Sequence, residues 1–127
     1  MLKYLVPALA FVGAATMPSF AHHATVMFAL DKEVTLNGTV TKFQYTNPHS
    51  SVQILVSRAG APPIEWRIET VSPLVLERAG IEPDSLQPGE RVSVRARPLR
   101  NGGPRGWLID VTKADGTVLS LPEPYTD

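Results

Sequence analysis

The sequence predicts an all-β fold with one short helix, arranged as a small five-stranded barrel similar to an OB-fold. Five segments after residue 33 alternate apolar and polar residues, which is typical of half-buried strands. A helical segment lies between the third and fourth strands, as in an OB-fold. The first segment is long and changes its apolar phase near its end, as a strand does when it bends to serve both halves of a barrel. Another small β-barrel or a β-sandwich is the alternative.

The first strand is expected to start at Val34, where regular alternation begins. Phe43 and Tyr45 continue the apolar series one position out of phase, which predicts a bulge or bend. Gly38 predicts a close approach between backbones within this strand. Asn47-Pro48 then marks a turn.

The second strand is expected over residues 52–56 and the third over residues 64–70, separated by a loop over residues 59–63. A short helix follows, with Ser72 as N-cap, proline at its first position and Gly80 at its end. The remaining elements are a turn over 86–90, a fourth strand over 91–97, a loop over 101–104, a fifth strand over 107–111, and a hairpin at Asp115-Gly116 into 117–121.

The first 21 residues have the pattern of a secretory signal peptide. Lys3 precedes an apolar run that is too short to span a bilayer, and Ser19-Phe20-Ala21 provides the small residues of a cleavage site. We expect cleavage after Ala21 and a periplasmic protein without a membrane span. The expected parts are therefore a signal peptide over 1–21, an extended arm over 22–33, a barrel domain over 34–121 and a tail over 122–127. An uncleaved N-terminal anchor is the alternative.

Composition excludes several classes of function. The 127-residue chain has a net charge of zero and no cysteine. Without its signal peptide it carries about one negative charge, so no basic surface for nucleic acid or anionic membrane is expected. An arginine-rich stretch over residues 91–105 is interpreted as a solvated strand face and loop. The absence of cysteine excludes thiolate metal sites and thiol redox chemistry.

The sequence assigns no catalytic residue and no organic cofactor site. It has no Ser-His-Asp arrangement with the spacing of a nucleophile elbow and no glycine-rich phosphate loop that opens a helix. Glu65 and Glu69 alternate along one strand and are interpreted as a solvated face with cross-strand ion pairs. Trp66 and Trp107 share the phase of core residues, which favours packing over a role as stacking platforms.

An ordered set of motifs spans nearly the whole chain after the signal: His-His, VTLNGTVTKFQYTNPHS, EWRIET, SPLVLERAGI, LQPGERVSVRARPLRNG and VTKADGTVL. This set resembles a family of small bacterial periplasmic proteins known only as a domain of unknown function. The resemblance implies a single barrel-type domain after a signal peptide and no established activity. The chain departs from the pattern at Ala24, where serine is usual, and at Ala29, where aspartate usually follows the aromatic residue.

The three histidines of the chain fall in two of these motifs, His22 and His23 at the expected mature N-terminus and His49 in Asn-Pro-His-Ser. An N-terminal histidine can chelate a metal through its α-amine and Nδ1, and a second imidazole completes a site of three nitrogens. This ligand supply is similar to that of histidine-brace copper proteins. Three nitrogens without thiolate favour Cu(II), with nickel and zinc as alternatives. His23 is the third ligand, the second imidazole or a bystander.

Geometry permits this pairing, because an arm of about 12 residues at roughly 3.3 Å each can fold back to the turn that holds His49. We therefore predict a periplasmic protein for copper handling or delivery, not an enzyme; an oxidative copper enzyme lacks an identifiable substrate surface. The alternative is a metal-free binding module, in which the barrel face or the loop over 101–105 recognises a peptide, glycan or protein partner.

Overall fold

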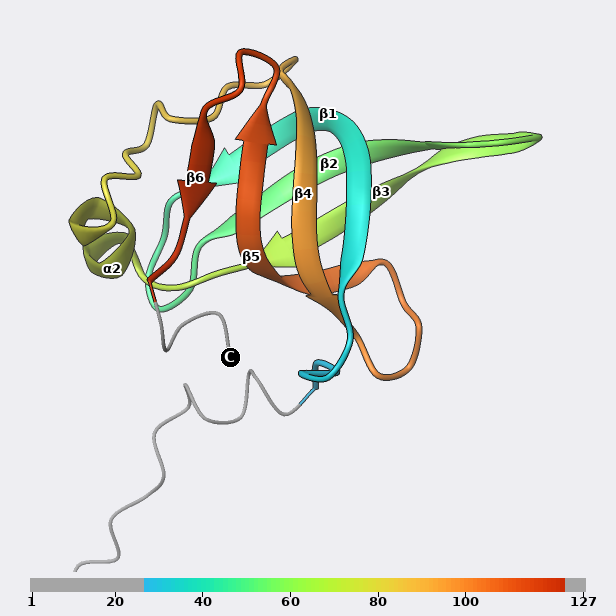
Figure 1. Ribbon diagram of the computed structural model, residues 1–127, viewed down its shortest axis with the longest axis horizontal. Helices are drawn as coiled ribbons and strands as arrows, with labels where there is room; N and C mark the ends of the chain where they lie inside the picture. The colour runs from blue at the N-terminus through green and yellow to red at the C-terminus, as the bar shows by residue number, and fades with distance from the viewer. Residues whose placement is uncertain (1–26, 123–127) are drawn as a thin grey trace, which may run out of the picture.

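The computed structural model describes residues 27–122, which form six strands and one short helix (Figure 1). The expected signal peptide, the first part of the arm with His22 and His23, and most of the expected tail lie outside the described residues. The elements are β1 (Val34–Gln44), β2 (Ser51–Arg58), β3 (Ala61–Glu69), α2 (Pro73–Arg78), β4 (Arg91–Pro98), β5 (Arg105–Lys113) and β6 (Val118–Ser120).

Five of the strands close into a ring. Antiparallel pairs join the strands in the order β3-β2-β1-β4-β5, and a short parallel pairing between β3 and β5 closes it. β6 adds to the outer edge of β5, as the Asp115-Gly116 hairpin predicted. The predicted all-β fold with a five-stranded, OB-fold-like ring and one short helix is thus confirmed, although the ring is not quite a regular barrel. No helix among residues 27–122 is long and apolar enough to cross a membrane.

The predicted bulge and close approach in β1 are both present. The register between β1 and β2 shifts between Val40 and Lys42, where the apolar phase changes. Gly38 pairs with β2 on one side and β4 on the other. A Cβ atom there would lie 2.7 Å from the carbonyl oxygen of Leu55, so only glycine fits without displacement of backbone.

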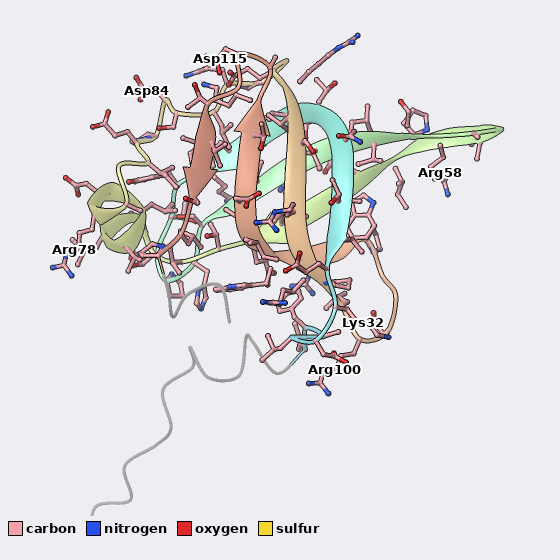
Figure 2. All side chains as sticks on the ribbon, viewed as in Figure 1. Lys32, Arg58, Arg78, Asp84, Arg100 and Asp115 are labelled. Carbon is pink, nitrogen blue, oxygen red and sulfur yellow. The ribbon has the colours of Figure 1, made fainter. Side chains whose placement is uncertain are left out.

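The expected loop over residues 59–63 is wrong, because Ala61, Pro62 and Pro63 belong to β3. Strands β2 and β3 form a tight hairpin that turns at Gly60, whose φ of +69° favours glycine. Its tip, marked by Arg58, projects beyond the ring (Figures 1 and 2). The prolines lie where the β2–β3 register shifts, a position at which a residue without an N–H group is tolerated.

The helix α2 has the predicted bounds to within a residue. Ser72 is its N-cap residue, Pro73 its first residue, and Gly80 follows its end with a φ of +77°. The Ser72 side chain makes no capping hydrogen bond. Instead, the phenol of Tyr45 is within 3.0 Å of the carbonyl oxygens of Pro73 and Ile81, which attaches both sides of the helix to the end of β1.

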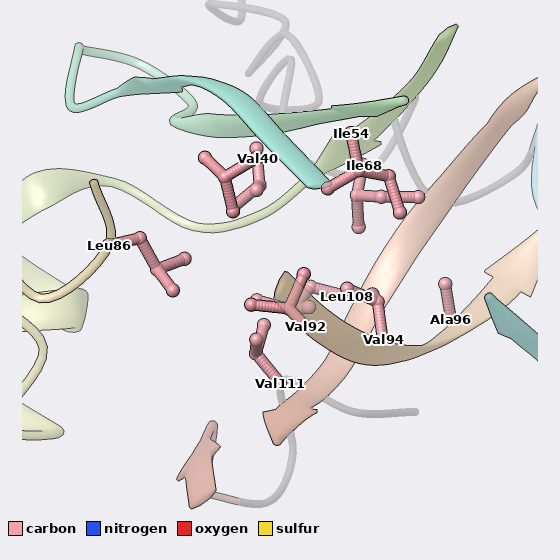
Figure 3. Packing of buried hydrophobic residues seen from close by; sticks show 10 residues of the cluster. Val40, Ile54, Ile68, Leu86, Val92, Val94, Ala96, Leu108 and Val111 are labelled. Carbon is pink, nitrogen blue, oxygen red and sulfur yellow. The ribbon is translucent and has the colours of Figure 1, made fainter. Parts of the chain in front are cut away.

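Two clusters of buried side chains fill the molecule. The larger lies inside the ring and consists of Val40, Val52, Ile54, Ile68, Leu86, Val92, Val94, Ala96, Leu108 and Val111 (Figure 3). The second lies at the end of the ring beside α2 and consists of Phe28, Val71, Leu76, Ile81, Trp107 and Leu121.

Strand β5 contributes to both clusters because it contains a bulge. Arg95 pairs with Asp110 and Ala96 with Leu108, so Ile109 has no direct partner on β4. Trp107 therefore packs in the second cluster while Leu108 and Val111 enter the first. The expectation of one continuous alternating strand is wrong here. The prediction that Trp107 is a core residue is confirmed, and Trp66 packs half-buried against the larger cluster.

Candidate functional site

His49 lies in the connection between β1 and β2, directly after a cis peptide bond between Asn47 and Pro48. Local hydrogen bonds fix this turn: the Thr46 hydroxyl donates to the carbonyl oxygen of His49 (3.1 Å), and the Thr46 N–H donates to the Ser50 hydroxyl (3.2 Å). The imidazole of His49 is half-buried. Its Nδ1 atom is buried and has no hydrogen-bond partner within residues 27–122.

The neighbour of His49 is Trp107, at the start of β5. The two rings meet edge to face, with centroids 5.9 Å apart and planes at 77°. The same indole contacts Phe28 at a centroid distance of 6.1 Å. Trp107 thus lies between the histidine of the turn and the arm that leads to the N-terminus.

The arm is attached to the ring at this point. Phe28 is fully buried and forms an isolated β-bridge with Leu99, just after β4. The Ala29 N–H donates to the carbonyl oxygen of Pro98 (2.8 Å), and the Arg100 N–H donates to that of Met27 (3.0 Å). Met27, the first described residue, is therefore held against the ring next to the Phe28–Trp107 pair.

Buried polar atoms without hydrogen-bond partners concentrate at this end of the ring. Besides His49 Nδ1, the described chain contains three: Ser51 Oγ, Thr70 Oγ1 and Arg105 Nε. All lie where β2, β3 and β5 meet, since Ser51 pairs with Glu69 and Glu69 with Trp107. Buried polar groups in native proteins are almost always satisfied. Water, further chain or a ligand can each satisfy atoms of this kind.

The charges near this end form pairs. Glu69 accepts a hydrogen bond from Arg105 and lies 3.8 Å from Arg67. Glu65, further along β3, accepts a hydrogen bond from the Thr41 hydroxyl (3.2 Å). Glu69 is thus ion-paired, as the sequence predicts, but its side chain is only 15% exposed and does not lie on a solvated face.

The arginine-rich stretch is also partly paired. Arg95 binds Asp110 through two nitrogens and contacts Glu33 (3.4 Å), which also lies 3.8 Å from Arg97. In the loop that follows β4, the Arg100 Nε donates to the carbonyl oxygen of Phe28 (3.2 Å). These contacts hold the arm against the ring.

Of the three predicted ligands, the structure places only His49. His22 and His23 lie outside the described residues. Within residues 27–122, no group of three histidine, cysteine, aspartate or glutamate side chains could hold a metal ion. A metal site of such side chains at His49 would therefore need ligands from outside these residues. Only five residues separate His22 from Phe28, which corresponds to a reach of roughly 20 Å at about 3.3 Å per residue.

Sequence reasoning missed the indole neighbour of His49 and the unsatisfied hydroxyls of Ser51 and Thr70. Trp107 is 58 residues from His49, and the parallel β3–β5 contact that brings them together has no local sequence signal. Ser51 begins β2 and Thr70 directly follows β3, close to the strand ends that the sequence predicts. Their burial, however, depends on the pairing of β3 with β5.

Comparison with known proteins identifies a family without assigning an activity. Residues 10–114 match a family of unknown function, DUF6152. No curated protein matches the chain.

Proposed function

The chain belongs to DUF6152, a family of unknown function, and we propose that it is an exported protein that binds copper through His22 and His49. The His22 α-amine and imidazole would form one chelate, and the imidazole of His49 would complete a site of three nitrogens. His23 would be a third ligand residue, the second imidazole in place of His49, or a bystander. Such a donor set favours Cu(II) over Ni(II) and Zn(II).

The observation that carries this proposal is the unpartnered, buried Nδ1 of His49 beside the point where the arm enters. If Nδ1 binds the metal, the metal satisfies it. If Nε2 binds the metal, Nδ1 carries the proton and needs an acceptor, as metal-bound histidines usually have one. In both cases the arm, or a metal that the arm holds, would supply a partner for Nδ1.

Copper binding would serve handling, delivery or tolerance in the periplasm. A catalytic role is not part of this proposal. The ligands must be unprotonated to bind, and an unperturbed α-amine has a pKa of about 8. Affinity for copper is therefore expected to fall as the pH is lowered from 8 to 6.

Trp107 provides a direct readout of this site. Cu(II) quenches a nearby indole, so copper held by His49 would strongly quench Trp107, whose ring centroid is 5.9 Å from the imidazole. The protein would be purified from the periplasm with its N-terminus verified by intact mass. Copper would then be titrated in a Trp66→Phe background, in which Trp107 is the remaining tryptophan. We expect one equivalent of Cu(II), with a nitrogen-rich electron paramagnetic resonance spectrum.

Three variants separate this site from adventitious binding. His49→Ala and the addition of one glycine before His22 should each weaken binding at least tenfold. His49→Ala removes one nitrogen ligand, and the added glycine separates the α-amine from the His22 imidazole. His23→Ala tests whether the neighbouring imidazole is a ligand. Binding that is unchanged in both His49→Ala and the extended protein would refute the proposal and favour the metal-free binding module, in which the histidines are dispensable.

Export is tested separately by the intact mass of the periplasmic protein. Cleavage after Ala21 gives a mature chain that starts at His22. A chain that retains residues 1–21 would have no α-amine on His22, and the chelate could not form.

A further inference from the structure

A groove on the outer face of the ring lies away from the His49 end. It has a volume of about 520 Å³ and is bounded by β1, β2, β4 and the end of β5. Gly38, which pairs with both β2 and β4, lies in this groove, and the β2–β3 hairpin projects away from the ring (Figure 1). It falls in the size range of small-molecule sites, which is roughly 300–1,000 Å³.

The strand register places two rows of side chains side by side in this groove. Thr39 pairs with Leu55 on one side and with Arg91 on the other. In the next row, Ser93 pairs with Asn37 and with Thr112. Directly opposed residues in adjacent strands have Cβ atoms about 4.5–5.5 Å apart, so these six side chains form one continuous patch.

The polar members of this patch are uncommitted. Thr39, Ser93, Thr112 and Asn37 make no side-chain hydrogen bond within residues 27–122, and Arg91 makes neither a hydrogen bond nor an ion pair there. By contrast, Arg95, two positions along the same strand, binds Asp110. The groove therefore offers a free guanidinium among groups that both donate and accept hydrogen bonds.

The charge of the groove is positive. No aspartate or glutamate lines it, and its second cation, Lys113, is held in place by Glu90 (3.0 Å) and by the Ser85 carbonyl oxygen (2.9 Å). Leu55, which is 40% exposed, is its large exposed apolar side chain. A protein interface needs about 1,000 Å² with an apolar centre, and nucleic acid needs a basic stripe; this groove provides neither.

From these observations we propose that the groove binds a sugar that carries a carboxylate or a phosphate group. Arg91 binds the anionic group with its planar fork, which matches both anions. The hydroxyls of Thr39, Ser93 and Thr112 and the Asn37 amide bind sugar hydroxyls, and Leu55 covers the apolar face of the ring. This site is independent of the copper proposal, since it shares no residue with it.

Amide chemical shifts of the full mature protein would be followed by NMR during titration with glucuronate, glucose 6-phosphate, glucose and inorganic phosphate. Open polar sites bind weakly, so concentrations up to about 50 mM are needed. We expect both acidic sugars, or one of them, to shift the amides of Thr39, Ser93 and Thr112. The tighter of the two identifies the preferred anion. Glucose and inorganic phosphate should bind at least about tenfold more weakly, because each lacks half of the recognised groups.

Arg91→Gln should weaken binding of the acidic sugar about tenfold or more. The affinity of Arg91→Lys should lie between those of the wild type and Arg91→Gln. Arg78→Gln is the matched control, because Arg78 is an exposed arginine without a partner in the described chain and lies on α2, away from the hairpin (Figure 2). The proposal is overturned if neither acidic sugar shifts these amides. It is also overturned if glucose or inorganic phosphate binds as tightly, or if Arg91→Gln binds as well as Arg78→Gln does.

Discussion

At the scale of single residues, Gly38 allows the close approach between β1 and β2. A methyl group at Gly38 would meet the Leu55 carbonyl oxygen at 2.7 Å and Val56 Cγ2 at 3.3 Å. Since the carbonyl belongs to a paired strand, it cannot move aside without displacing β2. We expect Gly38→Ala to lower the free energy of unfolding by about 1–3 kcal/mol, measured by urea denaturation.

Gly103→Ala is the control for this prediction. Its added methyl would meet the ends of the Asn101 and Leu99 side chains at 3.2 and 3.3 Å; Leu99 can rotate, and Asn101, whose Oδ1 accepts a hydrogen bond from the Gly103 N–H, needs to give by only a few tenths of an ångström. A change of about 0.5 kcal/mol or less is expected, as for most surface substitutions. Equal losses in the two variants would show that the β1–β2 contact at Gly38 is not the constraint.

Residue-scale features with local causes were predictable from sequence. A glycine within an alternating strand indicates close approach, and the phase change at Phe43 indicates the bulge, because each depends on neighbours in sequence. The importance of His49 was inferred from the scarcity of histidine and its place in a motif. Its contact with Trp107 was not predictable, because it depends on how distant strands meet.

At the scale of elements, one phenol links α2 to the end of β1 by hydrogen bonds, in addition to the packing of Leu76 in the second cluster. The Tyr45 hydroxyl is shared between the carbonyl oxygens of Pro73 and Ile81. Tyr45→Phe should therefore lower the free energy of unfolding by about 1 kcal/mol at pH 7. A heat or urea transition followed by circular dichroism measures this difference.

The same contact predicts a dependence on alkaline pH. Burial raises the pKa of Tyr45 above its usual value of 10.0, and the negative charges of Glu77 and Glu82 raise it further. A folded-state pKa above the unfolded value means that the stabilisation is complete below pH 10 and is lost as the pH rises through the folded pKa. The difference between wild type and Tyr45→Phe should thus shrink above pH 10. A difference that is constant from pH 7 to about pH 11 would contradict this.

The predictions that are wrong concern segments whose structure is determined by pairing with a neighbouring strand and not by local composition. Residues 59–63 have the composition of a loop, yet Pro62 and Pro63 extend β3 because the register shift beside them requires no N–H donor. In β5, alternation alone placed Ile109 in line with Trp107 and Val111. The bulge opposite Arg95 and Ala96 moves Leu108 inward instead, and only the partner strand determines this.

At the scale of the whole molecule, one short parallel contact joins the two halves of the ring and forms the end at which His49 lies. Residues 67–69 of β3 pair with residues 105–107 of β5. This closure brings Trp107 to His49 and collects the unsatisfied Ser51 and Thr70 hydroxyls in one place. Sequence predicted the order of elements and hence the fold class, but long-range pairing has no local pattern, so the surroundings of His49 were not foreseen.

The arm is expected to be part of the folded unit, and Phe28 tests this. Its side chain is fully buried, contacts Trp107, and continues the second cluster that α2 also contacts. Phe28→Ala should lower the free energy of unfolding by about 3–5 kcal/mol in urea denaturation, because it removes a buried ring and leaves a cavity. Met27→Ala is the control, since Met27 is 43% exposed and should cost about 0.5 kcal/mol or less. Because Phe28 and His49 share one indole, the loss should also change the fluorescence of Trp107 before unfolding. If Phe28→Ala is as stable as Met27→Ala, the arm is not held by this ring, and His22 has no fixed path to His49.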